Sequence, residues 1–344
     1  MKKLAFYDAK PYDRIWFEKL KDKYGFEFKY FENKLNSDTA LMSAKCEGAV
    51  AFVNDVIDEK TINALYEHGI RIIALRCAGY NNVDFKAAFG KIHVVRVPAY
   101  SPYAVAEHAM ALLLTLDRKT HRAYNRTRDF NFNISGLAGF DLHGKTMGVI
   151  GTGKIGQVFV DICKGFGMKV IAYDPFPVPD KGINYVALDK LFLESDIISL
   201  HCPLNKSTHH MINADSIKLM KNGVYIINTS RGALIDSEAL LNAIKAQKVS
   251  GAGLDVYEEE SELFFVDFSN TIIQDDVLAR LISMPNVIVT SHQAFLTNEA
   301  LHNIAEITLN NLKEYFDGKG LTNEICYQCE KLGNCVKNDK QRCF

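Results

Sequence analysis

The feature that most constrains the fold of this chain is a glycine-rich turn, Gly151-Thr152-Gly153-Lys154-Ile155-Gly156. It follows a short apolar segment, residues 147–150, that reads as a strand, and it leads into residues 157–166, which have helical spacing. In such a strand–turn–helix unit the first glycine permits a tight turn, the second lets the backbone approach a ligand, and the third lets helix and strand pack closely. The pattern therefore predicts a parallel α/β domain with an anion site at the start of a helix.

Apolar segments alternate with amphipathic ones along most of the 344 residues, which predicts parallel sheets covered by helices. This length suggests about two domains. We predict a doubly wound α/β fold with a discontinuous first domain, and the main predicted strands are 4–7, 26–30, 49–53, 72–75, 94–97, 147–150, 169–173, 197–201, 224–228, 253–257 and 287–290. Predicted helices are 12–24, 59–68, 102–116, 157–166 and 298–316, the last returning to the first domain.

An acidic residue, Asp174, stands at the end of the strand that follows the glycine turn. A carboxylate in this position can accept hydrogen bonds from both hydroxyls of an adenine ribose, and it would repel the additional phosphate of NADP. The alternative is a surface aspartate beside a glycine-rich turn of no special function. Because strand, glycines, helix, strand and acid occur in order, we predict that the chain binds NAD through Gly151, Gly153, Lys154, Ile155, Gly156 and Asp174.

Three side chains follow later predicted strands, at the edge where open α/β sheets place their ligands. Arg231 has the planar fork that a carboxylate needs, and His292 can donate a proton near neutral pH. A carboxylate among Glu258, Glu259 and Glu260 could orient that imidazole, and sequence position does not choose among them. These groups suit reduction of a 2-oxo acid. Each also has an ordinary explanation, namely a surface turn, a solvated glutamate or a helix cap.

Charge and hydropathy exclude several other classes of protein. Forty basic and forty-one acidic residues leave a net charge of −1, without the basic surplus of a nucleic-acid or anionic-membrane binder. We find no apolar run of the roughly 18 residues that a membrane span needs, and the first residues turn polar too soon for a signal peptide. Cys46, Cys77, Cys163 and Cys202 lie in apolar contexts that suit reduced thiols. We therefore expect a cytoplasmic protein with a small-molecule partner.

Longer motifs in the same order resemble the D-isomer-specific 2-hydroxyacid dehydrogenases, and within them most closely the bacterial fermentative D-lactate dehydrogenases. The resemblance covers about residues 3–325. Besides the glycine turn it is carried by Arg76-Cys77-Ala78-Gly79-Tyr80-Asn81-Asn82-Val83-Asp84, Val95-Arg96-Val97-Pro98-Ala99-Tyr100-Ser101-Pro102, Asn228-Thr229-Ser230-Arg231-Gly232-Ala233-Leu234-Ile235-Asp236, Asp255-Val256-Tyr257-Glu258-Glu259-Glu260 and Ser291-His292-Gln293-Ala294-Phe295.

The resemblance implies that Arg231 binds substrate, that His292 is the acid/base and that Glu260 is its partner. It implies that Ala78, Gly79, Tyr100 and Phe295 contact the substrate and that His201, Thr229 and Asp255 line the cofactor side. It also implies a flavodoxin-like substrate domain of residues 1–99 and 297–325, a Rossmann NAD-binding domain of residues 100–296, an active-site cleft between them and a homodimer or homotetramer. Pyruvate giving D-lactate is the expected reaction. The alternatives are a larger 2-oxo acid, such as phenylpyruvate or 2-oxoisocaproate, and an NAD-sensing scaffold protein.

Residues 326–344 form a cysteine-rich tail that the resemblance does not cover. Cys326, Cys329, Cys335 and Cys343 could bind zinc or an iron–sulfur cluster, or they could belong to a flexible appendage with reduced thiols. A metal- or redox-sensing role for this tail is a further alternative. The pair His209-His210, and separately His201, could also suggest a metal. No third ligand is convincingly placed, so we favour surface or cofactor-lining roles for these histidines.

Overall fold

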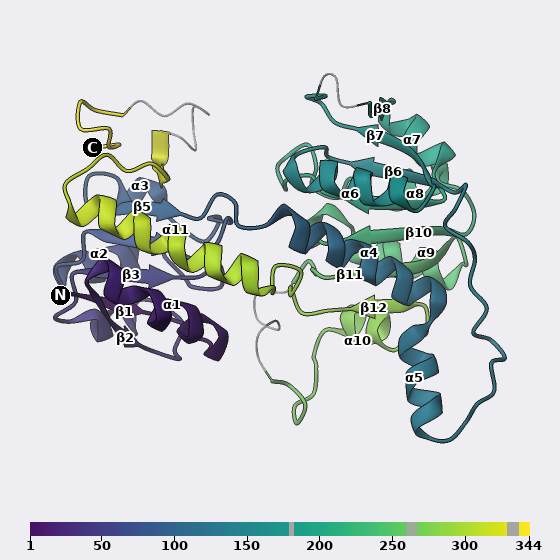
Figure 1. Ribbon diagram of the computed structural model, residues 1–344, viewed down its shortest axis with the longest axis horizontal. Coiled ribbons are helices and arrows are strands. Elements are labelled where there is room, and N and C mark those ends of the chain that lie inside the picture. The colour runs from purple at the N-terminus through teal and green to yellow at the C-terminus, as the bar shows by residue number, and fades with distance from the viewer. Residues whose placement is uncertain (179–181, 260–263, 265–266, 329–336) are drawn as a thin grey trace. The chain divides into compact units, whose positions relative to one another are not determined.

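The computed structural model describes residues 1–178, 182–259, 264, 267–328 and 337–344. By contacts within the chain it divides into two compact units (Figure 1), Met1–Ser101 with Thr297–Phe344, and Pro102–Leu296. Each unit is a largely parallel sheet covered by helices, which confirms the predicted fold class. Within the described residues, no helix is both long and apolar enough to span a membrane.

The first unit contains a sheet with strand order β13-β5-β4-β3-β1-β2. Its strands are β1 (Lys2–Phe6), β2 (Phe26–Tyr30), β3 (Gly48–Ala51), β4 (Ile72–Leu75), β5 (His93–Arg96) and β13 (Glu324–Ile325). All neighbours pair in parallel except β13, which runs antiparallel to β5. The chain order reverses between β1 and β3, as in flavodoxin-like sheets.

Helices α1 (Pro11–Tyr24), α2 (Glu59–Glu67), α3 (Phe85–Ala88) and α11 (Asn298–Phe316) and a 3₁₀ turn, η1 (Ala40–Ser43), complete the first unit. Helix α11 has the bounds predicted from its periodicity and packs beside α1 (Figure 1). Thr297 caps it, because the Thr297 hydroxyl oxygen accepts from the Ala300 amide at 3.2 Å. Its apolar side chains, including Leu309 and Leu312, join the core beneath the sheet.

The second unit contains a parallel sheet with order β12-β11-β10-β9-β6-β7-β8. The strands are β6 (Thr146–Ile150), β7 (Lys169–Tyr173), β8 (Asn184–Tyr185), β9 (Ile197–Leu200), β10 (Val224–Asn228), β11 (Val249–Leu254) and β12 (Val287–Val289). Chain order reverses between β6 and β9, next to the glycine turn. This is the switch point at which doubly wound sheets bind their ligands.

Helices cover both faces of this second sheet. Helix α4 (Pro102–Arg118) packs on α6 (Lys154–Gly165), and their apolar faces share one core. The opposite core lies under α7 (Leu188–Glu194), α8 (Ala214–Leu219), α9 (Ser237–Lys245) and α10 (Asp276–Ile282). Helix α5 (Thr120–Arg128), which has no buried residue, extends from the end of α4.

Strand β11 differs from its predicted range of 253–257, since it begins at Val249 and ends at Leu254. The periodicity placed its start too late because Gly251 is a poor strand former. In the structure a Cβ at Gly253 would stand 3.1 Å from the Leu112 side chain of α4. Close packing of a helix on this strand therefore explains Gly253, which local propensity disfavours. The short edge strands β8 and β13 also carried too little pattern to be predicted.

A buried arginine organises the carboxyl end of the first unit's sheet. Arg76, directly after β4, is 1% exposed. It donates to the Asp8 carbonyl oxygen at 2.6 Å, pairs with the Asp13 carboxylate at 3.2 Å and stands over the Phe52 ring at 4.2 Å. Three segments of the first unit are thus tied to one guanidinium.

Replacing Arg76 by Met should reduce the free energy of unfolding by about 3–5 kcal/mol, because the buried Asp13 carboxylate would lose its counter-ion. Urea titration of both variants measures this change. Arg71→Met, at a partly exposed site just before β4, is the control and should cost less than about 1 kcal/mol. Equal effects of the two substitutions would contradict a structural role for Arg76.

Candidate functional site

The glycine turn connects β6 to α6 and has the contacts expected of a phosphate-binding loop. Gly151 has φ +93°, and a Cβ there would lie 2.6 Å from the His201 carbonyl oxygen. A Cβ at Gly156 would lie 2.0 Å from the Gly151 carbonyl oxygen, whereas one at Gly153 would meet nothing within 4 Å. Helix α6 begins at Lys154, earlier than predicted, which places Lys154 and Ile155 in its first turn. The turn therefore directs helix N-terminal amides toward open space.

Asp174 lies directly after β7 and is held against this turn. One carboxylate oxygen, Oδ2, accepts from the Thr152 amide at 2.7 Å and from the Thr152 hydroxyl at 3.0 Å. The other, Oδ1, accepts from the Phe176 amide at 2.9 Å. Oδ2 thus accepts two hydrogen bonds already, whereas Oδ1 accepts one and keeps a lone pair. The carboxylate is therefore fixed in place, and Oδ1 can still accept from a ribose hydroxyl.

Two further residues predicted to contact the cofactor lie at the ends of β9 and β10. The His201 ring packs 4.7 Å from the Phe159 ring, and burial lowers the pKa of His201 to about 3. His201 is therefore neutral at physiological pH and is a poor candidate for the acid/base. The Thr229 hydroxyl is buried and has no hydrogen-bond partner among the described residues, as expected of a group that contacts a ligand.

Strand register brings the predicted catalytic segments to one edge of the sheet. Asn228 of β10 is paired with Leu254 of β11, which is paired with Val289 of β12. The three strands therefore end side by side, and the segments that carry Arg231 and His292 leave the sheet at the same level. The turn carrying Arg231 is fixed by Asn228, whose side-chain amide donates to the Arg231 carbonyl oxygen at 2.8 Å.

The segment that carries His292 is held by the carboxylate of Asp255. This fully buried residue accepts from the Thr290 hydroxyl at 2.6 Å, the Gln293 amide at 2.9 Å and the Ala294 amide at 2.8 Å. The Asp255 carbonyl oxygen also accepts from the His292 amide at 2.8 Å. His292 has φ +53°, a conformation that a non-glycine residue keeps only when its surroundings enforce it. The hydrogen bonds to Asp255 provide that constraint.

His108 also contacts this segment, and the sequence did not predict it. From helix α4, its Nε2 lies 3.2 Å from the Thr290 hydroxyl oxygen and 3.3 Å from the Asp255 carboxylate. His108 thus contacts, from α4, the segment that carries His292 and the carboxylate that holds it. Nothing local marks it, since it is one of several polar residues in a mainly apolar helix and is distant in sequence from its partners.

The structure describes some of the remaining predicted site residues but not all of them. Glu260 lies outside the described residues. Phe295 is buried at 8% exposure. In the first unit, the carbonyl oxygens of Ala78 and Gly79 accept from Arg96 and from the Cys77 thiol, and their amides have no acceptor within the described part of the chain. The Tyr100 carbonyl oxygen accepts from Asn303 at 2.7 Å. Their roles toward substrate stay predictions.

In the tail, Cys329 and Cys335 lie outside the described residues, so the predicted metal site there is untested. Cys326 and Cys343 are buried. The end of the chain is attached to the first unit, because Phe344 stacks on His93 with ring centroids 4.2 Å apart and the Cys343 amide donates to Glu324 at 2.7 Å. These last residues therefore do not form a loose appendage.

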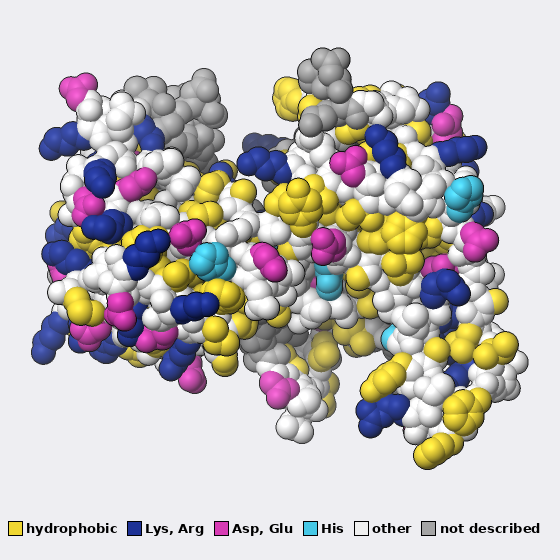
Figure 2. Space-filling view, viewed as in Figure 1, with side chains coloured by type: hydrophobic (Ala, Val, Ile, Leu, Met, Phe, Trp, Pro, Cys, Tyr) yellow, Lys and Arg dark blue, Asp and Glu magenta, His cyan; other side chains and the backbone are white. Residues whose placement is uncertain are grey.

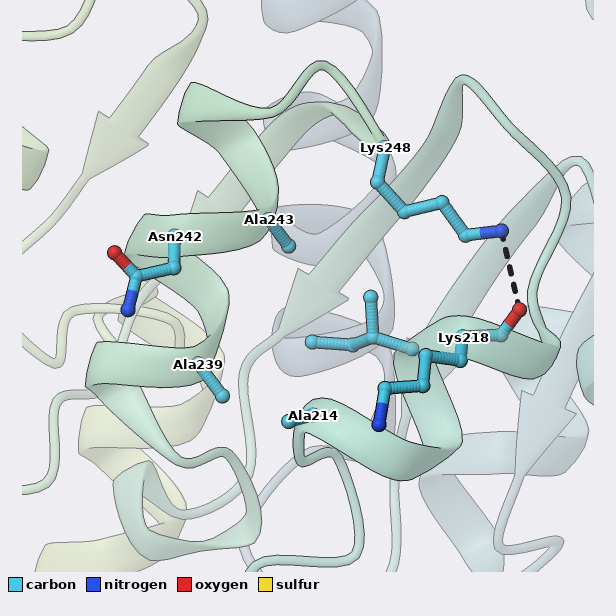
Figure 3. Close-up of a pocket in the computed structure, with 7 residues that line it drawn as sticks. Ala214, Lys218, Ala239, Asn242, Ala243 and Lys248 are labelled. Carbon is cyan, nitrogen blue, oxygen red and sulfur yellow. Dashed lines mark hydrogen bonds between the residues drawn. The ribbon is translucent and has the colours of Figure 1, made fainter.

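A surface hollow between α8 and α9 lies apart from all of these residues (Figure 3). It is lined by Ala214, Ile217, Lys218, Ala239, Asn242, Ala243 and Lys248, and the Lys248 ammonium donates to the Lys218 carbonyl oxygen at 3.2 Å. With small apolar side chains and an amine already engaged by backbone, the hollow offers no group suited to redox chemistry.

Comparison with known proteins identifies relatives over nearly the whole chain. The sequence profile described as "D-isomer specific 2-hydroxyacid dehydrogenase, NAD binding domain" matches residues 110–294. The D-lactate dehydrogenase of Escherichia coli is 51% identical over 328 residues, which are 94% of this chain and 99% of that protein. Its apo structure is similar with a TM-score of 0.87, at 49% identity over the same shares.

Two other solved structures are also similar. A structure reported for the pyruvate reductase of Chlamydomonas reinhardtii has a TM-score of 0.90 at 44% identity, over 94% of this chain and 98% of that one. A structure of D-2-hydroxyisocaproate dehydrogenase has a TM-score of 0.84 at 32% identity, over 94% and 99%. Near-complete coverage in both directions confirms the resemblance seen in the sequence: the chain belongs to the D-isomer specific 2-hydroxyacid dehydrogenases, a family of NAD-dependent oxidoreductases.

Proposed function

We propose that this protein is a D-lactate dehydrogenase that reversibly reduces pyruvate to D-lactate with NADH. The observation that carries the proposal is the in-register ending of β10, β11 and β12, which presents Arg231 and His292 at the edge that also holds the glycine turn. The 51% identity to a D-lactate dehydrogenase supports pyruvate as substrate. The lower identity, 32%, to the D-2-hydroxyisocaproate enzyme makes a branched 2-oxo acid the second candidate.

Arg231 would bind and orient the substrate, and His292 would transfer the proton. The guanidinium of Arg231 forms paired hydrogen bonds with the carboxylate and C2 oxygen of pyruvate, which orients the carbonyl carbon. Bound NADH supplies the hydride that this carbon accepts. His292, as imidazolium, donates its proton to the C2 oxygen as negative charge develops there, and Glu260 orients the ring and stabilises its charged form. In lactate oxidation the neutral His292 ring takes that proton back.

The first unit would contribute contacts to the substrate carboxylate. We assign this role to the amides of Ala78 and Gly79, which lack acceptors within the described residues, and to the Tyr100 hydroxyl. Phe295 would form an apolar wall beside the substrate methyl group. On this reading residues 1–99 with 297–325 form the substrate domain, and residues 100–296 form the NAD-binding domain.

We further propose a homodimer or homotetramer, formed through the NAD-binding domain. The supporting observation is a group of exposed apolar side chains on α5 and the segment after it, seen as yellow atoms at the lower right of Figure 2. Phe130 is 85% exposed and Ile134 is 80% exposed. A second copy of this chain would cover them.

A cytoplasmic location accords with the buried thiols of Cys163 and Cys202, whose pKa values burial raises to about 12 and about 11.

The direct test is an assay of NADH oxidation with pyruvate, followed by chiral analysis of the product. We expect turnover and D-lactate, with kcat/KM for pyruvate above that for 2-oxoisocaproate, phenylpyruvate and hydroxypyruvate. L-lactate, or preference for a branched 2-oxo acid, would contradict the assignment.

Arg231→Lys should lower kcat/KM for pyruvate about 100-fold or more, because an ammonium cannot form the paired contact.

Asp174 should set the choice between NAD and NADP. Replacing Asp174 by Ala removes the carboxylate that accepts from the ribose and repels a 2′-phosphate, so the preference for NADH over NADPH should fall tenfold or more, about 1.4 kcal/mol. The ratio of the two kcat/KM values measures it. Asp189→Ala, at the start of α7, serves as control. An unchanged ratio in Asp174→Ala would remove Asp174 from the cofactor site.

A further inference from the structure

Two adjacent histidines and one glutamate form a compact cluster that the proposed reaction does not use. Ligand atoms of His209, His210 and Glu258 all lie within 4.8 Å of one another. Glu258 is the partner that sequence spacing did not supply, since it stands 48 residues beyond His210. We propose that this cluster binds one divalent transition-metal ion, of which zinc is the best match, and that the ion joins the segments following β9 and β11.

The loop after β9 holds the two histidines in a fixed arrangement. The His209 amide donates to the Asn205 carbonyl oxygen, and the His210 amide donates to the Ala233 carbonyl oxygen, each at 2.9 Å. His210 has φ +49°, and its carbonyl oxygen accepts from the Asn213 side chain at 2.8 Å. This left-handed residue turns the two neighbouring imidazoles to the same side, where their rings stack with centroids 4.0 Å apart and an angle of 26°.

Glu258 reaches the same place from the end of β11. The backbone between Tyr257 and Glu258 lies against Gly232, where an added Cβ would stand 2.0 Å from the Tyr257 carbonyl carbon. Any other residue at position 232 would push this segment away. With glycine there, the Glu258 carboxylate contacts His210 Nε2 directly.

The ligand set fits zinc in type and in number. Two imidazole nitrogens and one carboxylate oxygen, with a fourth position left for water, form an established zinc arrangement. Ligands about 2.0–2.1 Å from a tetrahedral ion stand roughly 3.3 Å apart. The His210 and Glu258 ligand atoms, which are in hydrogen-bond contact, would therefore separate slightly to admit the ion, and the His209 nitrogen would adjust to complete the site. The exposed His209 side chain can make that movement. Magnesium, which prefers oxygen ligands, should not bind here.

A metal at this cluster would act on the edge of the sheet that carries the proposed catalytic residues. Through His210 and Ala233 the loop after β9 is attached to the 3₁₀ turn η2 (Gly232–Leu234), which directly follows Arg231. Through Glu258 it is attached to the segment that leads to Glu260. Zinc binding would thus fix three strand-end segments relative to one another, and thermal stability of the second unit should rise.

The experiment compares full-length wild-type protein with His209→Asn and Glu258→Gln after treatment with a chelator. His68→Asn, which removes an exposed histidine from the end of α2, is the matched control. Calorimetric titration with Zn²⁺ and thermal unfolding with Zn²⁺ or Mg²⁺ are the two readouts. The cysteine tail is present in all four proteins, so any zinc that it binds cancels in the comparison.

We expect wild type and His68→Asn to bind one more zinc ion than the other two variants, or to bind it at least tenfold more tightly. Zinc, but not magnesium, should raise their Tm. With Co²⁺, the bands lost in His209→Asn should be visible ligand-field bands and not the near-ultraviolet bands of cobalt thiolates. Equal zinc binding by all four proteins, or equal stabilisation by magnesium, would overturn the proposal. Because these readouts do not involve turnover, failure of the lactate assignment would leave this test unaffected.

Discussion

The arrangement of this site depends on one buried carboxylate. Asp255 stands where β11 leaves the sheet, and it accepts hydrogen bonds from three donors on the segment after β12. Those bonds help to hold His292 in its left-handed conformation, which is unfavourable for histidine. A buried carboxylate with all of its bonds made is rigid, and it is costly to disturb. Asp255 thereby fixes the position of the segment that carries His292, the proposed acid/base.

Glycines allow the neighbouring strand ends to come equally close. Gly156 lies against Gly151 in the cofactor turn, Gly232 lies against Tyr257 beside Arg231, and Gly253 lets α4 pack on β11. In each case a Cβ would meet backbone or packed side chains at 3.1 Å or less. The sheet edge therefore brings a helix N-terminus and the segments that carry Arg231 and His292 to one level, as the proposed transfer of a hydride and a proton to a small oxo acid requires.

Local pattern predicted much of this structure. Strands 26–30, 72–75, 169–173 and 224–228 and helix 298–316 have the bounds expected from hydrophobic period, because each is uninterrupted and ends at a clear turn or cap. The glycine turn and Asp174 were predicted because a phosphate-binding unit requires its residues in fixed order over a short stretch. Family membership was likewise recognisable from long motifs, and the comparisons confirmed it.

What depends on distant contacts could not be predicted. His108 meets Thr290 across 182 residues, and Glu258 meets His210 across 48, without local signal in either case. The bounds of β11 were misplaced because close packing, of Tyr225 at Gly251 and of α4 at Gly253, and not propensity, explains its glycines. Choice among three adjacent glutamates likewise needs the positions of side chains that only folding brings together, and Glu260 itself lies outside the described residues.

The central claim is that His292, positioned by Asp255, carries the proton of the reaction. Its most direct test is the pH dependence of kcat/KM in both directions, measured for wild type and for His292→Gln. If the imidazolium donates in reduction and the neutral ring accepts in oxidation, reduction should slow as pH rises and oxidation should slow as pH falls. The variant should lose both trends and about 10²–10⁴-fold in rate. Parallel trends in the two directions, or a variant that keeps wild-type rates, would contradict the account.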